Sequence, residues 1–236
     1  MIETLPETGS TNADLAARIS GGEMLPEGHW LVADRQSAGR GRQGRVWFDG
    51  AGNFMGSTLV NLRQGDPAPH TLALVAGLAV HEAVSGHVPP PLRVKLKWPN
   101  DAMIGAAKLA GILLERVGGA VVVGIGVNLA AAPPVEGRET VTLSQFGPAP
   151  DRDGFAQALA ACFAGELARW RNAGLAPVIA RWLAVGHPLG TPLTVGVAGA
   201  EELVGRFAGL DEDGALRLTL PDGATRAIHA GEVNLA

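Results

Sequence analysis

The segment AGRGRQGR, residues 38–45, holds the densest group of side chains able to do chemistry. Its glycines follow the spacing G-x-G-x-x-G, and arginines alternate with them. Glycine lets backbone N–H groups approach an anion closely, and arginine offers paired hydrogen bonds to a phosphate or carboxylate. The segment therefore indicates an anion-binding loop. The spacing alone also fits a dinucleotide-binding turn, an RNA-binding arginine–glycine patch or an ordinary solvated turn.

The residues around the glycines disfavour a dinucleotide-binding turn. Such a turn directly follows a strand and opens a helix whose N-terminus faces the pyrophosphate. Here QSA separates the glycines from the preceding apolar run, and RVWFDGAGNF after them is a poor helix former. The acidic residue expected about 20 positions further on would fall near LVNL, which has none. A nicotinamide-dependent oxidoreductase is therefore the weaker hypothesis.

Three further polar groups interrupt apolar stretches of the chain. KWPND places Asn100 and Asp101 in a turn after a predicted strand, because Pro99 ends that strand. Lys108 precedes the apolar run of KLAGILLE, and Asn128 stands near the end of the apolar run in GIGVNL. Each feature alone is common: an Asn-Asp turn, a solvated edge lysine and a structural amide. Their order along the chain identifies a protein family more specifically than any one feature does.

In that order, the chain resembles the biotin–protein ligases, also called biotin–[acetyl-CoA-carboxylase] ligases. The matching segments are STN (residues 10–12), QSAGRGRQGRVW (36–47), KWPND (97–101), KLAGILLE (108–115) and GIGVNL (124–129). A lipoate–protein ligase shares the expected fold, but that family has a different glycine-rich stretch and lacks KWPND followed by KLAGILLE. We therefore favour a biotin–protein ligase.

The resemblance implies an α+β fold: a mixed, largely antiparallel sheet with flanking helices, as in class II aminoacyl-tRNA synthetases and biotin–lipoate ligases. A small C-terminal β-barrel of the Src-homology-three type is expected to follow it. We place the catalytic domain at residues 1–186 and the barrel at residues 187–236, where short predicted strands replace helices.

The resemblance also implies an activity in two steps. Biotin reacts with ATP and Mg²⁺ to give biotinyl-5′-AMP and pyrophosphate. The biotinyl group then passes to one lysine of the biotin carboxyl carrier protein of acetyl-CoA carboxylase, or of a related carboxylase. The first step brings two anions together and so needs cations, and the second needs a neutral lysine amine.

Site residues follow by the same resemblance. Lys108, Arg40 and Arg42 would hold the carboxylate and phosphate oxygens, and Asp101 would orient and deprotonate the acceptor lysine. The residues expected around biotin are Ser10, Thr11, Asn12, Gln36, Gly39, Arg40, Lys108, Gly111, Ile112 and Leu113. Those expected around ATP and the adenylate are Arg40, Arg42, Arg45, Trp47, Asn100, Lys108 and Asn128. The resemblance assigns no ligands of Mg²⁺.

The elements that must position these residues can be predicted from hydrophobic patterns. A helix begins at STN, a core helix covers residues 71–87, and strands in KLAGILLERV and AVVVGIGVNL form a hairpin. NFMGSTLVNL is expected to be a strand with a bulge at Gly56, and Asp153 is expected to cap a helix that runs to about residue 171. A long loop is expected at residues 131–150, and a turn at Gly199.

Charge and composition limit which kinds of partner the protein is expected to bind. The net charge is −4, and the segment from residue 201 onward, with three Arg and seven Asp or Glu, accounts for all of it. A neutral body disfavours a nucleic-acid module, and the nine residues before Ser10 are too few for the helix-turn-helix of the repressor members of the family, so we expect no nucleic-acid binding. Cys162 is the one cysteine, which fits the cytoplasm, and no uncharged apolar run suggests a membrane helix. Members of the family dimerise through their sheet, so a homodimer is possible.

Overall fold

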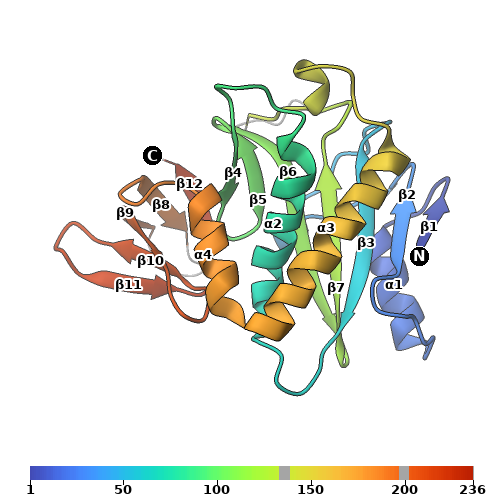
Figure 1. Cartoon of the computed structure of the whole chain (residues 1–236), viewed down its shortest axis with the longest axis horizontal. Coiled ribbons are helices and arrows are strands. Elements are labelled where there is room, and N and C mark those ends of the chain that lie inside the picture. The colour runs from blue at the N-terminus through green and yellow to red at the C-terminus, as the bar shows by residue number, and fades with distance from the viewer. Residues whose placement is uncertain (133–138, 197–201, 236) are drawn as a thin grey trace.

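The large sheet is the frame of the molecule. The computed structural model describes residues 1–132, 139–196 and 202–235, and Figure 1 shows a layer of helices packed on this sheet with a smaller sheet beside it. Its seven strands lie in the order β1-β2-β3-β7-β6-β5-β4; β1 and β2 are parallel, and the other neighbours are antiparallel. The strands are β1 (Ile2–Leu5), β2 (Trp30–Ala33), β3 (Phe54–Asn61), β4 (Val94–Lys97), β5 (Asp101–Ile104), β6 (Ala107–Val117) and β7 (Ala120–Val127). The predicted α+β fold with a mixed, largely antiparallel sheet is confirmed.

The two faces of this sheet have different covers. Helices α2 (Leu72–Ser85), α3 (Arg152–Ala173) and α4 (Leu175–Val185) lie over one face, and α1 (Thr11–Ser20) lies on the other (Figure 1). Short 3₁₀ turns occupy Arg42–Gly44, Pro69–Thr71 and Leu143–Gln145. Within the described residues, no helix is both long and apolar enough to span a bilayer.

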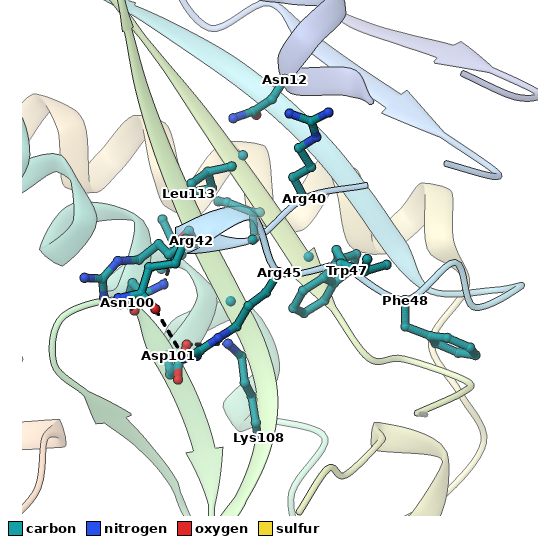
Figure 2. Close-up of a pocket in the computed structure, with 18 of the residues that line it drawn as sticks. Asn12, Arg40, Arg42, Arg45, Trp47, Phe48, Asn100, Asp101, Lys108 and Leu113 are labelled. Carbon is teal, nitrogen blue, oxygen red and sulfur yellow. Dashed lines mark hydrogen bonds and ion pairs between the residues drawn. The ribbon is translucent and has the colours of Figure 1, made fainter. Parts of the chain in front are cut away.

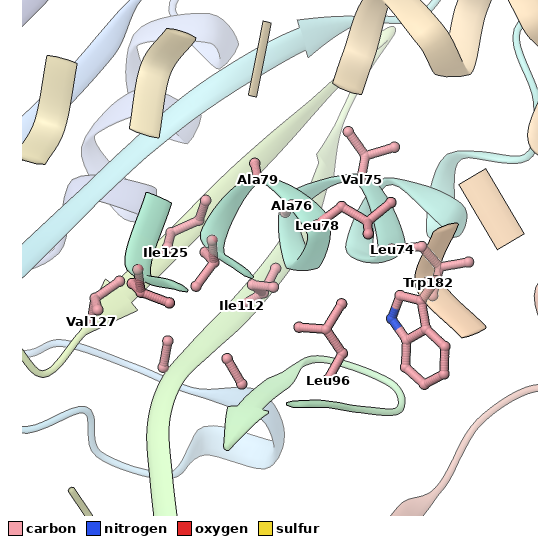
Figure 3. Packing of buried hydrophobic residues seen from close by; sticks show 14 of the residues in the cluster. Leu74, Val75, Ala76, Leu78, Ala79, Leu96, Ile112, Ile125, Val127 and Trp182 are labelled. Atoms are coloured by element: carbon pink, nitrogen blue, oxygen red, sulfur yellow. The ribbon is translucent and has the colours of Figure 1, made fainter. Parts of the chain in front are cut away.

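The main core lies between the sheet and α2. Figure 3 shows side chains of this helix, among them Ala76 and Ala79, against Leu96, Ile112 and Ile125 of the strands. Helix α2 is apolar on nearly all sides, as expected for a helix buried between a sheet and the second helix α3.

Strand β7 shows why the other face is open. Its side chains alternate between the faces of the sheet. Val121, Val123 and Ile125 belong to the main core, whereas Val122 packs in a small cluster under α1. Positions 124 and 126 point to the same side as Val122, but both are glycine. The α1 side of the sheet therefore has room for groups that come from elsewhere in the chain.

The second sheet contains the C-terminal strands. It is antiparallel, in the order β11-β10-β9-β8-β12. Its strands are β8 (Pro192–Gly196), β9 (Leu203–Leu210), β10 (Leu216–Thr219), β11 (Thr225–Ile228) and β12 (Glu232–Leu235). Trp182 of α4 packs edge-on against Phe207 at 6.3 Å, and the indole N–H of Trp98 donates to the carbonyl of Gly214 at 3.1 Å. The predicted small β module is thus present, and it packs against the part of the chain that forms the large sheet and its helices. The domain boundary near residue 186 stays a prediction.

Two local predictions about caps and bulges are wrong. Asp151, not Asp153, caps α3, because its carboxylate accepts the N–H of Gly154 at 2.8 Å. Gly56 is not a bulge, since β3 pairs without a break, with Gly56 opposite Ile125.

The prediction for the segment KWPND is half right. A turn does follow Lys97, but Asp101 is not in it: Asp101 begins strand β5 and pairs with Lys97 across a tight hairpin. The edge strand β1 has too few residues to give a pattern and was not expected. The predicted turn at Gly199, and residues 133–138 of the predicted loop, lie outside the described residues.

Candidate active site

A cavity of about 730 Å³ opens on the α1 side of the large sheet (Figure 2). Strands β3, β6 and β7 contribute to its floor. Its walls come from the start of α1, the loop at residues 40–48, the β4–β5 hairpin and β12 of the small sheet. The volume lies within the range of roughly 300–1,000 Å³ that small-molecule sites occupy.

Glycines of the floor make room for side chains of the walls. A Cβ atom on Gly124 would lie 2.3 Å from Oδ1 of Asn12, and one on Gly126 would lie 2.2 Å from the indole of Trp47. Gly111 lies opposite Gly126 on β6, and a Cβ atom on it would lie 3.0 Å from the indole of Trp47 and from Nζ of Lys108. The glycines in GIGVNL and KLAGILLE are thus required by the close approach of these side chains.

Two lysines and one carboxylate meet at the cavity. Asp101 is buried, with its Oδ1 2.5 Å from Nζ of Lys108 and its Oδ2 3.4 Å from Nζ of Lys97. Nζ of Lys108 also lies 5.7 Å from the ring centroid of Trp47. Among the described residues, the ammonium groups of Lys97 and Lys108 thus meet at the carboxylate of Asp101, and cations in a buried position attract an incoming anion.

Arg42 adds a cation that is held from two sides. Its guanidinium donates to Oδ1 of Asn100 at 3.1 Å and to the carbonyl of Gly231 at 3.0 Å. Asn100 is itself fixed, because its Nδ2 donates to the carbonyl of Ile112 at 2.8 Å. Burial lowers the pKa of Arg42, although Asp101 nearby favours its charged form. An arginine remains protonated despite such a shift, so Arg42 is a positioned charge.

The other arginines of the loop are more exposed. Arg45 pairs with both carboxylate oxygens of Glu232 on β12, and this hydrogen bonding raises the pKa of Arg45. Arg40 is exposed on the cavity wall, and Figure 2 shows its side chain extending toward Asn12. The loop thus places cations along the cavity, and the C-terminal segment at the start of β12 holds two of them, Arg42 and Arg45.

The end of the cavity near α1 is built from uncharged, buried side chains, toward which the guanidinium of Arg40 extends from the loop (Figure 2). The N–H of Thr11 donates to Oε1 of Gln36 at 2.8 Å, and Oγ1 of Thr11 lies 2.7 Å from Oγ of Ser57. Ser57 donates to Oδ1 of Asn12 at 2.6 Å, and Ser10 caps α1. These side chains are at least nine-tenths buried. Ser57 was missed from the sequence, because a serine inside an apolar strand gives no signal; its pairing opposite Gly124 brings it into the cavity.

Two residues expected at the nucleotide, Asn128 and Trp47, differ in how far their polar groups are already hydrogen-bonded. Nδ2 of Asn128 donates to the carbonyls of Val141 and Lys108, at 3.2 and 3.4 Å, so its Oδ1 is what remains for a ligand. The indole N–H of Trp47 is buried and has no hydrogen-bond acceptor within the described part of the chain.

Every residue that the sequence assigned to the site lines this cavity except Gly39. Gly39 lies behind the loop, where a Cβ atom would meet Nε2 of Gln36 and the carbonyl of Trp47 at 3.2 Å. Lys97 and Glu232 also line the cavity and were not assigned. Glu232 could not be found from the motifs, because it comes from the last strand of a separate sheet.

Fold and cavity together define a class of protein. It is an α+β protein with a small-molecule site that has a hydrogen-bonding end of uncharged side chains and a cationic end. Such a cavity fits a ligand with a neutral polar group at one end and an anionic group at the other.

Comparison with known proteins gives the same class. Residues 10–130 match the model of the biotin/lipoate A/B protein ligase family, and residues 189–235 match that of the biotin protein ligase C terminal domain. The biotin–[acetyl-CoA-carboxylase] ligase of Paracoccus denitrificans is 41% identical over 240 residues, covering 97% of this chain and 98% of the relative.

Solved structures are also similar over the whole chain. The biotin protein ligase from Aquifex aeolicus in complex with biotin and ATP has a TM-score of 0.85 at 28% identity, covering 100% of this chain and 98% of the other. That from Leishmania major in complex with biotinyl-5-AMP has a TM-score of 0.65 at 27% identity, covering 97% and 98%. The chain belongs to the biotin/lipoate A/B protein ligase family, among its biotin–protein ligases.

Proposed function

We propose that this ligase is a biotin–[acetyl-CoA-carboxylase] ligase that works in two steps. It activates biotin with ATP to biotinyl-5′-AMP, releasing pyrophosphate, and then transfers biotin to a lysine of a biotin carboxyl carrier protein. The single observation that carries the proposal is the division of the cavity: an uncharged, buried network at one end, and Lys108, Lys97 and Arg42 at the other. The similar ligases, whose structures hold biotin and ATP or biotinyl-5-AMP, support it.

The first step joins two anions. A carboxylate oxygen of biotin attacks the α-phosphorus of ATP, the new O–P bond forms, and the bond to pyrophosphate breaks. Lys108 is the residue that we assign to the meeting point, with Arg40 and Arg42 on the phosphates. Positioned cations stabilise the charge that builds up in such a transition state. The uncharged network of Ser10, Thr11 and Gln36 would hold the ureido ring of biotin.

The second step forms an amide. The amine of the carrier lysine attacks the acyl carbon of the adenylate, AMP leaves, and the amine must lose a proton. Asp101 is the group that we assign to orient the amine and to take this proton. Its contacts with the ammonium groups of Lys97 and Lys108 support this assignment, because they are the contacts that an incoming lysine would need.

Magnesium would enter with ATP. The carboxylates lining the cavity, among the described residues, are Asp101 and Glu232, and both are ion-paired. No group of three or more His, Cys, Asp or Glu side chains that could hold a metal occurs in that part of the chain. Mg²⁺ keeps several waters and binds substrate phosphates through few protein carboxylates, so this donor set fits a metal brought by the substrate.

One assay tests the proposal. The protein is incubated with biotin, Mg-ATP and a biotin carboxyl carrier domain, and the carrier is weighed by mass spectrometry. We expect a gain of one biotinyl group, and none when lipoate replaces biotin. No gain under conditions in which a known ligase labels the same carrier would overturn the proposal, and a lipoyl gain would favour the lipoate branch of the family. A cytoplasmic location and the absence of nucleic-acid binding stay predictions.

A further inference from the structure

One acidic side chain touches the uncharged end of the cavity from outside it. Glu115 lies on β6 and is exposed, but its Oε2 accepts a hydrogen bond from Nδ2 of the buried Asn12 at 2.6 Å. Asn12 lies over Gly124, where a side chain on the strand would displace it. The last residue of KLAGILLE is thus joined to the last residue of STN.

This contact fixes which way the amide of Asn12 points. A carboxylate is an acceptor only, so the NH₂ group of Asn12 must face Glu115. The reverse orientation would place two acceptor oxygens 2.6 Å apart. Oδ1 of Asn12 therefore faces Ser57, from which it accepts at 2.6 Å.

The fixed amide sets the direction of the next two hydrogen bonds. The hydroxyl of Ser57 has a single hydrogen, which goes to Asn12. At its 2.7 Å contact with Oγ1 of Thr11, Ser57 must therefore accept and Thr11 must donate. The 3.1 Å contact from the same hydroxyl to Oε1 of Gln36 is the weaker branch. The lone pairs of Thr11 Oγ1 are left to face the cavity as acceptors.

We infer that Glu115 is a positioning residue that sets the hydrogen-bond polarity of the cavity, so that the site accepts a ring N–H at Thr11 and disfavours a nitrogen without its hydrogen. The inference rests on the proposed function, because the ureido ring of biotin supplies N–H donors beside one carbonyl. Nε2 of Gln36 is a donor by the same logic, since Oε1 of Gln36 accepts from the backbone of Thr11. Loss of the carboxylate would let Asn12 turn, and the hydrogen of Thr11 could then point at the ligand.

The test compares biotin with an analogue methylated at a ureido nitrogen. Calorimetry on the full chain should give, for Glu115→Ala, a Kd for biotin raised about tenfold, the effect of one hydrogen bond lost. The Kd for the analogue should change less than about twofold, because it lacks the hydrogen that Thr11 accepts. The KM for ATP and kcat at saturating biotin should stay as in the wild type. Glu115→Gln keeps the length of the side chain, but its amide can donate as well as accept and so allows both orientations of the amide of Asn12; its Kd for biotin should lie between those of the wild type and Glu115→Ala.

Two further variants separate this role from a general effect on the strand. Arg116→Ala changes the next residue of β6, whose side chain is exposed and bonds within its own turn, to the carbonyl of Gly118; it should bind biotin as the wild type does. Ser57→Ala breaks the chain of hydrogen bonds at its middle and should reproduce the loss of preference for biotin over the analogue.

The possible failures are distinct. If Glu115→Ala weakens biotin and the analogue equally, if it leaves biotin unaffected, or if Glu115→Gln binds biotin more weakly than Glu115→Ala does, the inference on Glu115 is overturned. If the wild type does not bind biotin, the proposed function falls, and the inference on Glu115 falls with it.

Discussion

Lys108 is the residue on which the proposed first step depends most. It contacts Asp101 and Trp47, and it faces the place where we put the two anions. Lys108→Ala should slow adenylate formation about 100- to 1,000-fold, since loss of one positioned electrostatic donor costs roughly 2.7–4 kcal/mol in the transition state. Release of pyrophosphate in the presence of biotin and Mg-ATP measures this rate.

A second lysine provides the control for this variant. Lys95 is half-buried on strand β4 and does not line the cavity, so Lys95→Ala should release pyrophosphate at the wild-type rate. Asp101 keeps its contact with Lys97 when Lys108 is removed, so the variant is expected to fold. Adenylate formation at a normal rate in Lys108→Ala would contradict the assignment.

At the scale of elements, the floor of the cavity depends on strand glycines. Gly126→Ala would put a Cβ atom against the indole of Trp47. Trp47 lies on a loop and can move away, so we expect little change in the free energy of unfolding but at least a tenfold rise in the Kd for biotin or ATP, about 1.4 kcal/mol. Calorimetric titrations measure both affinities, and chemical denaturation measures stability.

A glycine elsewhere in the same hairpin is the control. A Cβ atom on Gly119, in the β6–β7 turn, meets nothing within 4 Å, and Gly119→Ala should leave both affinities unchanged. Unaltered binding by Gly126→Ala would mean that the position of Trp47 does not matter for the ligand.

The elements also show how far the sequence could be used for prediction. The hairpin of β6 and β7 followed from long apolar runs joined by Gly118 and Gly119, and the pairing Val117–Ala120 agrees. The pattern could not show that Asp101 begins a strand, because β5 is only four residues long and follows a tight turn. The arginine loop was found because its composition is unusual, whereas Ser57 depends on strand register. Local composition could therefore be used to predict parts of the site, whereas the pairing of distant segments could not be predicted from it.

A histidine just after α4, His187, should make stability depend on pH. His187 follows the bridge between Gly186 and Leu96, and burial lowers its pKa to about 4, with Lys95 and Lys97 acting in the same direction. In the unfolded chain its pKa is near 6.5, so the unfolded state binds a proton first as the pH falls. The folded protein therefore loses stability from about pH 6.5 down to about pH 4.

A variant without this histidine should lose less stability than the wild type as the pH falls. Between about pH 7 and about pH 4.5, the free energy of unfolding of His187→Gln should fall by about 1–2 kcal/mol less than that of the wild type, after allowance for partial exposure. Urea denaturation at several pH values measures the difference. His87 is exposed at the end of α2, and His87→Gln should follow the wild type. Parallel curves for the wild type and His187→Gln would show that His187 does not titrate in this way.

At the scale of the whole molecule, the cavity is closed by segments from opposite ends of the chain. Arg42 donates to the carbonyl of Gly231, and Arg45 pairs with Glu232, so the arginine loop of the large sheet rests on the start of β12. Motifs within the first 130 residues could not reveal this contact, because the small sheet carries no distinctive motif of its own. The small sheet is thus part of the site. The carboxylate of Glu232 on β12 acts on the same ligand anions as the arginines of the loop.

Glu232 should therefore weaken the binding of ATP. Its carboxylate neutralises Arg45 and adds a negative charge to the cavity wall. Glu232→Gln should lower the KM for ATP about two- to fivefold at low salt, because an exposed ion pair is worth at most about 1 kcal/mol. The gain should shrink at high salt, which screens exposed charges, and the KM for biotin should not change. Steady-state kinetics at two ionic strengths measure these effects, with Glu202→Gln, an exposed position directly before β9 and outside the cavity, as the control. A higher KM for ATP in Glu232→Gln would instead mean that the pair holds Arg45 where the phosphates need it, and that the small sheet helps nucleotide binding through this contact.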